Sequence, residues 1–240
     1  MKPKKIIRAG LQRIGYDVKR LPEPPSDSYQ QLLKIPSVAL SDLLGDAKAD
    51  VCLSIQKYKD SLLPYEQAIA LLAMAVIASP KAVLEIGTFM GHTTRLLAMN
   101  LPGAIIHTVD LPLDFVPEQD NVKEKKKDDF HLIAQRQVGR EYRGTPFEAR
   151  VRQHFVDTAI WDFKAAAGAT FFFIDGSHTY DYCKNDSDRC YQLCNGKGVF
   201  LWHDCDEAHP GVVKALLEWR ALGRDVVRIE GTPIAYWKAI

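Results

Sequence analysis

The sequence lacks three features that would each mark a different class of protein. Its longest apolar run, residues 68–78, is well short of the roughly 20 residues that a bilayer-spanning helix needs. Its 31 basic and 30 acidic residues nearly cancel, so it has no basic excess of the kind that nucleic-acid-binding proteins carry. Its five cysteines, an odd number in a chain of this size, do not suggest a disulfide framework. We therefore expect no transmembrane segment, no nucleic-acid partner, and a reducing compartment, the cytoplasm.

The length and composition predict one α/β domain with additions. The chain has 240 residues and is 47% hydrophobic, which is enough for a sizeable core. We divide it into an N-terminal helical arm, residues 1–62, and a domain, residues 63–240, with a lid-like insertion at residues 111–150. The insertion is far longer than an ordinary loop. A solvated surface helix is the alternative interpretation of the insertion, and its charged run, residues 123–129, is typical of solvated surface.

Strand-like and helix-like segments alternate along this domain. We predict strands at residues 83–86, 105–109, 151–156, 170–174, 199–202, 225–229 and 234–237, and helices at residues 64–79, 91–100, 158–167, 180–193 and 212–222. This alternation implies parallel strands joined by crossover helices. The last two strands are joined by a turn too short for a crossover, so they must be antiparallel. The predicted fold is a Rossmann-like, doubly wound sheet of seven strands, mostly parallel with one antiparallel strand, with helices on both faces.

Acidic and imidazole side chains follow two of the predicted strands. Asp175 and His178 belong to the segment Asp-Gly-Ser-His after one strand, and His203 and Asp204 follow the next strand along the chain. Ligands of open α/β sheets bind outside the carboxyl ends of the strands. Two neighbouring strands would therefore direct carboxylates and imidazoles into one crevice, which indicates an enzyme.

A glycine-containing turn, residues 85–94, follows another strand and opens a helix. Gly87 lets the backbone turn sharply, and Gly91 allows a ligand to approach the start of the helix. The spacing is G-x-x-x-G, which differs from the dinucleotide fingerprint G-x-G-x-x-G. The amides at the helix start favour an anionic group such as a carboxylate.

Three acidic residues extend this turn into a row of binding groups. Glu85, at the strand end, could receive an ammonium group. Asp110 ends the next strand and suits a ribose diol, while Asp157 ends the third and could accept from an adenine amino group. An amino acid, a ribose and an adenine in a row describe S-adenosylmethionine.

The turn, together with the segment Phe-Ile-Asp-Gly-Ser-His-Thr-Tyr at residues 173–180, resembles the class I S-adenosylmethionine-dependent methyltransferases. More narrowly, roughly residues 65–240 are similar to small-molecule O-methyltransferases of the catechol type and their bacterial macrolide-sugar relatives. The resemblance implies the strand order 3-2-1-4-5-7-6, with the last hairpin supplying strands six and seven. It also implies a set of cofactor-binding residues: Glu85, Gly87 and Thr93 for the methionine part, Phe89 for packing, Asp110 for the ribose, Asp157 and Thr158 for the adenine, and Thr88, Gly91 and Asp175 beside them.

Methyl transfer to a hydroxyl group requires the hydroxyl proton to be lost or loosened, and a divalent cation or a base can promote this. Asp175 and Asp204 are placed to bind Mg²⁺, which prefers oxygen ligands, as the corresponding carboxylates do in the catechol-type relatives. Those relatives have Asn after the second carboxylate, where this chain has Cys205, a poor Mg²⁺ ligand. Asp206 is therefore the candidate third ligand. His178 stands where relatives carry a lysine or histidine base, and we predict that His178 and Asp175 are catalytic.

Each histidine also has a simpler interpretation. His178 could be a loop residue that hydrogen-bonds to the backbone. His203 could pack or hydrogen-bond, with ligation of a softer metal as the alternative. His209 precedes Pro210 at the start of a predicted helix, a position that indicates a structural role.

The leading hypothesis is a metal-assisted, S-adenosylmethionine-dependent O-methyltransferase that acts on a small-molecule hydroxyl, such as that of a sugar. One alternative is a non-catalytic cofactor-binding or scaffold protein, against which the presence of Asp175, His178 and Asp204 argues. Another is an NAD-dependent oxidoreductase on the same fold, against which the glycine spacing argues. A homodimer, with the N-terminal arm as a contact element, stays open.

Overall fold

Short runs of β-branched and aromatic residues form the strands of one mixed sheet, and the segments between them form the helices that cover it. The computed structural model describes residues 26–54, 63–115 and 137–239. The strands of its 8-stranded sheet are β1 Ser37–Val38, β2 Ala82–Ile86, β3 Ile105–Asp110, β4 Val151–Phe155, β5 Phe171–Ile174, β6 Val199–Trp202, β7 Val227–Ile229 and β8 Ala235–Lys238. The helices are α2 Asp27–Leu32, α3 Leu40–Leu44, α4 Tyr65–Ala78, α5 His92–Asn100, α7 Tyr180–Leu193 and α8 Pro210–Ala221, with short 3-10 helices η2 Glu148–Arg150 and η3 Phe163–Ala166.

The order of the strands confirms the predicted doubly wound topology. The sheet runs β1-β7-β8-β6-β5-β2-β3-β4. Every neighbouring pair is parallel except the two pairs that involve β8, which is antiparallel to β6 and β7. Read from β2 as strand one, this is the order 3-2-1-4-5-7-6 with β1 added beyond β7. The carboxyl ends of β2, β3, β4, β5 and β6 therefore lie along one edge, where an α/β sheet binds its ligand.

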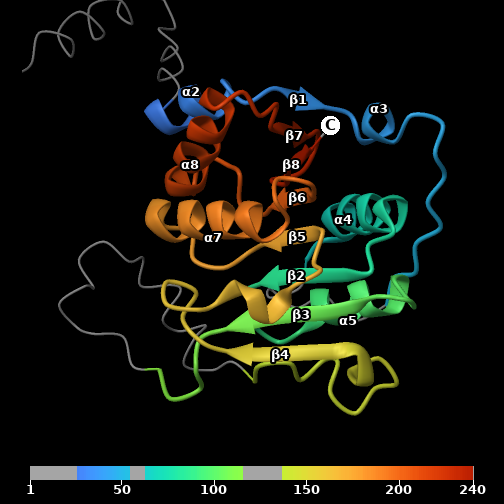
Figure 1. Ribbon diagram of the computed structural model, residues 1–240. Coiled ribbons are helices and arrows are strands. Elements are labelled where there is room, and N and C mark those ends of the chain that lie inside the picture. Colours follow the sequence, from blue (N-terminus) through green and yellow to red (C-terminus); the bar gives the residue numbers. More distant parts are fainter. Residues whose placement is uncertain (1–25, 55–62, 116–136, 240) are drawn as a thin grey trace, which may run out of the picture.

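Helices cover both faces of the sheet, as predicted. Figure 1 shows α7 and α8 side by side on one face, with α2 next to α8, and α4 on the opposite face. The central strand β5 is buried on both sides, because Phe172 and Ile174 pack into one apolar cluster while Phe171 and Phe173 pack into the other. Both clusters exclude water from the strands that carry the site residues at their ends.

Two local elements differ from the sequence prediction. The strand β1 was not predicted; it consists of two residues that pair in parallel with β7. The helix predicted at residues 158–167 is instead a turn followed by the 3-10 helix η3. Side-chain oxygens explain this difference, since Asp157 accepts from the amide of Ala159 (2.9 Å) and Asp162 from that of Lys164 (3.1 Å). Such bonds compete with helical ones.

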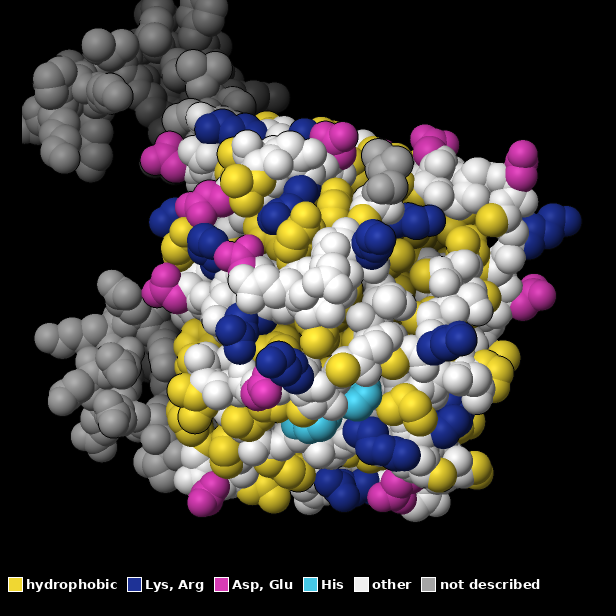
Figure 2. Space-filling view, viewed as in Figure 1, with side chains coloured by type: hydrophobic (Ala, Val, Ile, Leu, Met, Phe, Trp, Pro, Cys, Tyr) yellow, Lys and Arg dark blue, Asp and Glu magenta, His cyan; other side chains and the backbone are white. Residues whose placement is uncertain are grey.

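The remaining predictions about organisation concern the arm and the insertion. Residues 26–54 supply α2, β1 and α3, while residues 1–25 and 55–62 lie outside the described part. The charged run at residues 123–129 also lies outside it, so the lid stays a prediction. None of the helices among the described residues is long and apolar enough to cross a membrane. On the face drawn in Figure 2, the Lys and Arg side chains of the described residues are scattered among Asp and Glu.

Candidate active site

The turn between β2 and α5 needs glycine at two positions. Gly87 has φ +100°, and a Cβ atom there would lie 2.0 Å from the carbonyl oxygen of Asp175. Gly91 has φ +79°, and its Cβ would lie 2.7 Å from a ring carbon of Tyr142. Any other residue would clash with backbone or ring atoms, in a conformation that L-residues rarely adopt. Glycine therefore allows this turn to lie directly against the end of β5.

Glu85 is a fully buried carboxylic acid at the carboxyl end of β2. Its Oε2 accepts hydrogen bonds from the hydroxyls of Thr94 (2.5 Å) and Thr108 (2.6 Å). None of the described residues hydrogen-bonds to its other oxygen, Oε1, which is buried as well. Burial raises the pKa of Glu85 to about 8, although both threonines favour the charged form. A buried acid with one unpartnered oxygen suits a cationic ligand group, because such a group would offset the cost of ionising it.

A chain of hydroxyl and amide groups supports this acid. Thr88 Oγ1 lies 2.7 Å from Thr108 Oγ1 and accepts from Gln153 Nε2 at 3.0 Å. Thr108 faces Glu85 because the two residues are register partners on β2 and β3. Thr94 and Thr108 were not among the predicted site residues. Thr93, which was, is partly exposed on α5 and makes none of the hydrogen bonds to Glu85 among the described residues.

Asp110 ends β3 and is tied to the glycine turn. Its Oδ2 accepts from the backbone N–H of Phe89 at 2.7 Å. Phe89 has φ +47°, a left-handed conformation that non-glycine residues adopt rarely and often at functional sites. The hydrogen bond thus fixes the turn and the strand-end carboxylate relative to each other.

Asp157 and Thr158, after β4, are held against α7. Asp157 Oδ2 accepts from the hydroxyl of Tyr182 at 2.9 Å, and Asn185 Nδ2 donates to the carbonyl oxygen of Thr158 at 3.3 Å. Burial and the carboxylate of Asp157 raise the pKa of Tyr182 to about 12, so this tyrosine stays a donor at neutral pH. The sequence prediction did not include Tyr182 or Asn185.

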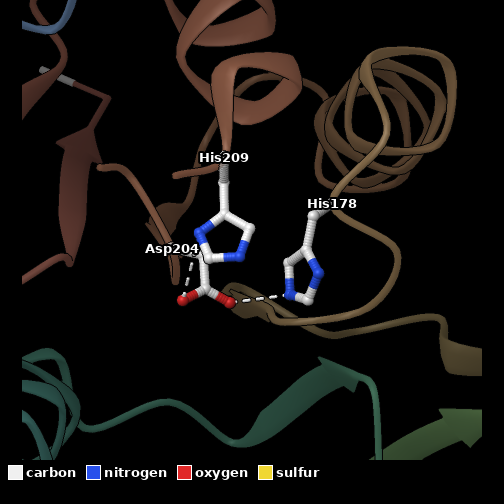
Figure 3. A group of neighbouring side chains, drawn as sticks. All are labelled: His178, Asp204 and His209. Carbon is white, nitrogen blue, oxygen red and sulfur yellow. Dashed lines mark ion pairs between the residues drawn. The ribbon is translucent and has the colours of Figure 1, made fainter. Parts of the chain in front are cut away.

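Imidazoles and carboxylates meet beyond the ends of β5 and β6. His178 Nε2 lies 2.7 Å from Asp204 Oδ2. His209, at the start of α8, lies on the other side, with Nδ1 at 3.7 Å from Asp204 Oδ1 and the two imidazole centroids 4.5 Å apart. Figure 3 shows both rings next to the Asp204 carboxylate. The predicted residues Asp175, His178, His203 and Asp204 are thus brought together, and His209 joins them.

His203 is held as a cation between two of these carboxylates. Its Nδ1 lies 3.1 Å from Asp175 Oδ1 and 3.1 Å from Asp204 Oδ2, and its Nε2 lies 2.7 Å from Gln67 Oε1 on α4. Burial opposes its charge, but the carboxylates outweigh burial and raise the pKa of His203 to about 11. Burial likewise disfavours ionised Asp204, but hydrogen bonds from His178 and His203 hold its pKa well below the ordinary value.

Among the described residues, two groups of three side chains could hold a metal ion. Their ligand atoms lie within 4.8 Å of one another in Asp175, His203 and Asp204, and in His178, Asp204 and His209. Asp206, the predicted third ligand, belongs to neither group of described residues. Its Oδ1 lies 2.9 Å from His209 Nδ1 and also accepts from the amides of Ala208 and His209. Cys205 is buried, which raises its thiol pKa to about 12 and makes it a poor ligand.

Comparison with known proteins places the chain in a family. A family model described as a methyltransferase domain matches residues 84–205, just over half of the 240 residues. The chain belongs to the methyltransferase family. The matched range runs from β2 to the end of β6, so it contains every predicted cofactor-binding residue and Asp204. The predicted recognition as a class I S-adenosylmethionine-dependent methyltransferase is confirmed. Asp206 and His209 lie just beyond the match.

Solved structures share the fold of this methyltransferase. An O-methyltransferase from Bacillus cereus, in complex with SAH, has a TM-score of 0.52 and 14% sequence identity, with 98% of this chain and 97% of that chain covered. Cofactor-bound Rv0187 from MTB has a TM-score of 0.50 and 15% sequence identity, with 99% of this chain and 97% of that chain covered. No curated protein sequence matches this chain.

Proposed function

We propose that this methyltransferase transfers the methyl group of S-adenosylmethionine to a hydroxyl group of a small molecule, and that His178 takes the hydroxyl proton. The observation that carries the proposal is the 2.7 Å contact between His178 Nε2 and Asp204 Oδ2 at the carboxyl edge of the sheet. The contact lies on the segment that touches the glycine turn, since the carbonyl oxygen of Asp175 packs against Gly87. A base and a cofactor turn therefore share one edge.

The residues around the turn fit the cofactor. Oε1 of buried Glu85, which has no hydrogen-bond partner among the described residues, suits its ammonium group, and the two glycines leave the turn open to close backbone approach. We propose that Asp110, which is tied to the turn at the end of β3, binds the ribose. The predicted set is retained as part of the proposal: Glu85, Gly87, Thr88, Phe89, Gly91, Thr93, Asp110, Asp157, Thr158 and Asp175. When bound, S-adenosylmethionine supplies an electrophilic methyl group.

The chain's own residues account for the proton. We propose that the Nε2 proton of His178 faces Asp204, which leaves the lone pair of the imidazole on Nδ1 to take up the hydroxyl proton. The imidazolium that results is stabilised by the ionised Asp204 carboxylate beside it. His203 cannot serve as this base, because both of its nitrogens already donate to acceptors. Asp175 contributes by holding His203, which in turn holds Asp204.

Magnesium assistance through Asp175, Asp204 and Asp206 does not fit the side chains as they are arranged. The described residues do not bring these three carboxylates to one point, and each metal-capable group includes imidazole nitrogen, which Mg²⁺ does not prefer. The residues present therefore do not support a step through Mg²⁺. A comparison of rates with added Mg²⁺ and with a chelator tests the sequence prediction directly.

The test of the proposed function has two stages. Calorimetric titration with S-adenosylhomocysteine, with NAD as the control, should show binding of the former alone; binding of NAD instead would refute the assignment. The protein is then incubated with labelled S-adenosylmethionine and a panel of acceptors, with sugar and glycoside hydroxyls first and thiols and amines as controls. Transfer to a thiol or an amine alone would refute the hydroxyl specificity. The five unpaired cysteines support the further proposal of a reducing compartment such as the cytoplasm.

A further inference from the structure

We propose that His178, Asp204 and His209 form a binding site for a borderline divalent metal ion such as Zn²⁺ or Co²⁺, and that the bound ion inhibits methyl transfer. Binding of the ion depends only on the three side chains. Inhibition rests on the proposed function, because it follows only if His178 is the base.

The donor set and its spacing suit such an ion. Two imidazole nitrogens and one carboxylate are ligands that borderline ions bind well, whereas Mg²⁺ prefers oxygen. In a tetrahedral zinc site with bonds of roughly 2.1 Å, ligand atoms lie about 3.4 Å apart. His178 Nε2 lies 2.7 Å from Asp204 Oδ2, and one ligand atom from each of the three side chains lies within 4.8 Å of the other two.

Asp206 prepares His209 to act as a ligand. Its Oδ1, 2.9 Å from His209 Nδ1, is itself fixed by two backbone amides. An imidazole that donates its Nδ1 proton to a carboxylate carries its lone pair on Nε2, and metal-binding histidines commonly have such a partner. In Figure 3 the Nε2 edge of His209 is turned toward the side of His178. Asp206, the predicted ligand, thus orients a ligand instead.

The backbone brings the three residues together from separate elements. A Cβ atom at Gly211 would lie 2.5 Å from the carbonyl oxygen of His178, so glycine there lets the start of α8 approach the loop after β5. Asp204 itself has φ +56°, a conformation that a non-glycine residue keeps only where its surroundings hold it. The side chains of His178, Asp204 and His209 remain 30%, 16% and 21% exposed, so an ion in solution can reach them.

Occupancy by a metal ion and uptake of a proton exclude each other at His178. Ligation through Nε2 requires the lone pair on that atom, so the ring keeps its one proton on Nδ1. Nδ1 then has no lone pair for the hydroxyl proton. The ion also neutralises Asp204, which would otherwise stabilise the imidazolium. Zn²⁺ should therefore inhibit, and a chelator should restore activity.

The experiment is a titration of the purified full chain with Co²⁺ alone, followed by its visible absorption and by calorimetry. The variants are His209→Ala and, as a second test of the same site, His178→Ala; His107→Ala, from the remote His107–His154 pair, is the control. Circular dichroism verifies folding of each. We expect one ion per chain for the wild type and for His107→Ala, undisturbed by millimolar Mg²⁺, and affinity at least about 10-fold weaker for each site variant. Absence of Co²⁺ binding, or unchanged affinity in both site variants, would overturn the site.

The activity arm separates this inference from the proposed function. With an acceptor from the panel, Zn²⁺ should inhibit the wild type, and the activity that His209→Ala retains should resist the same concentration. If the ion binds through these residues but transfer continues or speeds up, the inhibitory role and the base role of His178 are both wrong while the site stands. If no ion binds but His178→Ala abolishes transfer, the metal site is wrong and the proposed function stands.

Discussion

Replacement of Glu85 by glutamine should remove a large pH dependence of stability. Burial raises the pKa of Glu85 from 4.5 to about 8. The folded protein therefore keeps a proton that the unfolded chain releases, and the free energy of unfolding falls as pH rises from 4.5 to 8. At about 1.36 kcal/mol per pH unit, the loss is roughly 3 kcal/mol by pH 7 and roughly 5 kcal/mol above pH 8. The contribution of protonated Glu85 to the free energy of unfolding is complete below pH 4.5 and is lost above pH 8.

Urea unfolding at pH 5, 6, 7 and 8 measures this loss. Glu85→Gln cannot ionise, so its free energy of unfolding should lack this component and change less between pH 5 and 8 than that of the wild type. The exposed Glu230→Gln is the matched control and should follow the wild type. The other titrating groups are common to all three proteins. The difference between the pH profiles of wild type and Glu85→Gln therefore measures the effect of Glu85. Parallel profiles for wild type and Glu85→Gln would refute the reasoning.

The same acid should report on the cofactor. If the ammonium group of S-adenosylhomocysteine pairs with Glu85, binding favours the ionised carboxylate and lowers its pKa. At pH 7 the free protein holds the proton, so binding should release close to one proton. Calorimetry in two buffers of different ionisation enthalpy counts that proton, and Glu85→Gln should release none. Equal proton release by wild type and variant would place the ammonium group elsewhere.

The other predictions concern the base, the ribose site and the turn. His178→Ala should lower kcat by about 10²- to 10⁴-fold, and a change confined to KM would argue against proton transfer. Asp110→Ala should weaken binding of S-adenosylhomocysteine in calorimetry, and unchanged affinity would remove this residue from the ribose site. Gly87→Ala should lower the free energy of unfolding by roughly 1–3 kcal/mol, because its Cβ would lie 2.0 Å from the carbonyl oxygen of Asp175; equal stability in urea would contradict the packing.

The fold could be predicted because its strands carry strong local signals. The run that became β5 is uninterrupted apolar sequence, and the turn between β7 and β8 is too short for a crossover, which leaves only an antiparallel pair. The edge strand β1 has no such signal, since it consists of only two residues. The prediction of a helix at residues 158–167 was wrong because Asp157 and Asp162 accept hydrogen bonds from nearby amides. Hydrophobic periodicity does not reveal such bonds.

The candidate site residues that directly follow strands could be predicted from the sequence. Those whose position depends on tertiary contacts were missed. Asp175 and Asp204 meet because β5 and β6 are parallel neighbours. Thr108 reaches Glu85 only through the register of β2 and β3, which the sequence does not specify. His209 had a sufficient local explanation, as the residue before Pro210 at a helix start. Its place beside His178 depends on how closely α8 approaches, which is a property of packing.

The three imidazoles of the site have different roles because each one has different partners. His203 contacts acceptors through both nitrogens and is fixed as a cation, so it can orient Asp204 but cannot gain a proton. His209 directs Nδ1 to Asp206, beyond the range that the family match covers. His178 is the imidazole on the segment that packs against the cofactor turn. A carboxylate and the two imidazoles beside it are also a set of metal ligands. The features for which we propose His178 as the base therefore also expose it to metal ions, and direct metal binding, rather than rate alone, separates the two proposed roles.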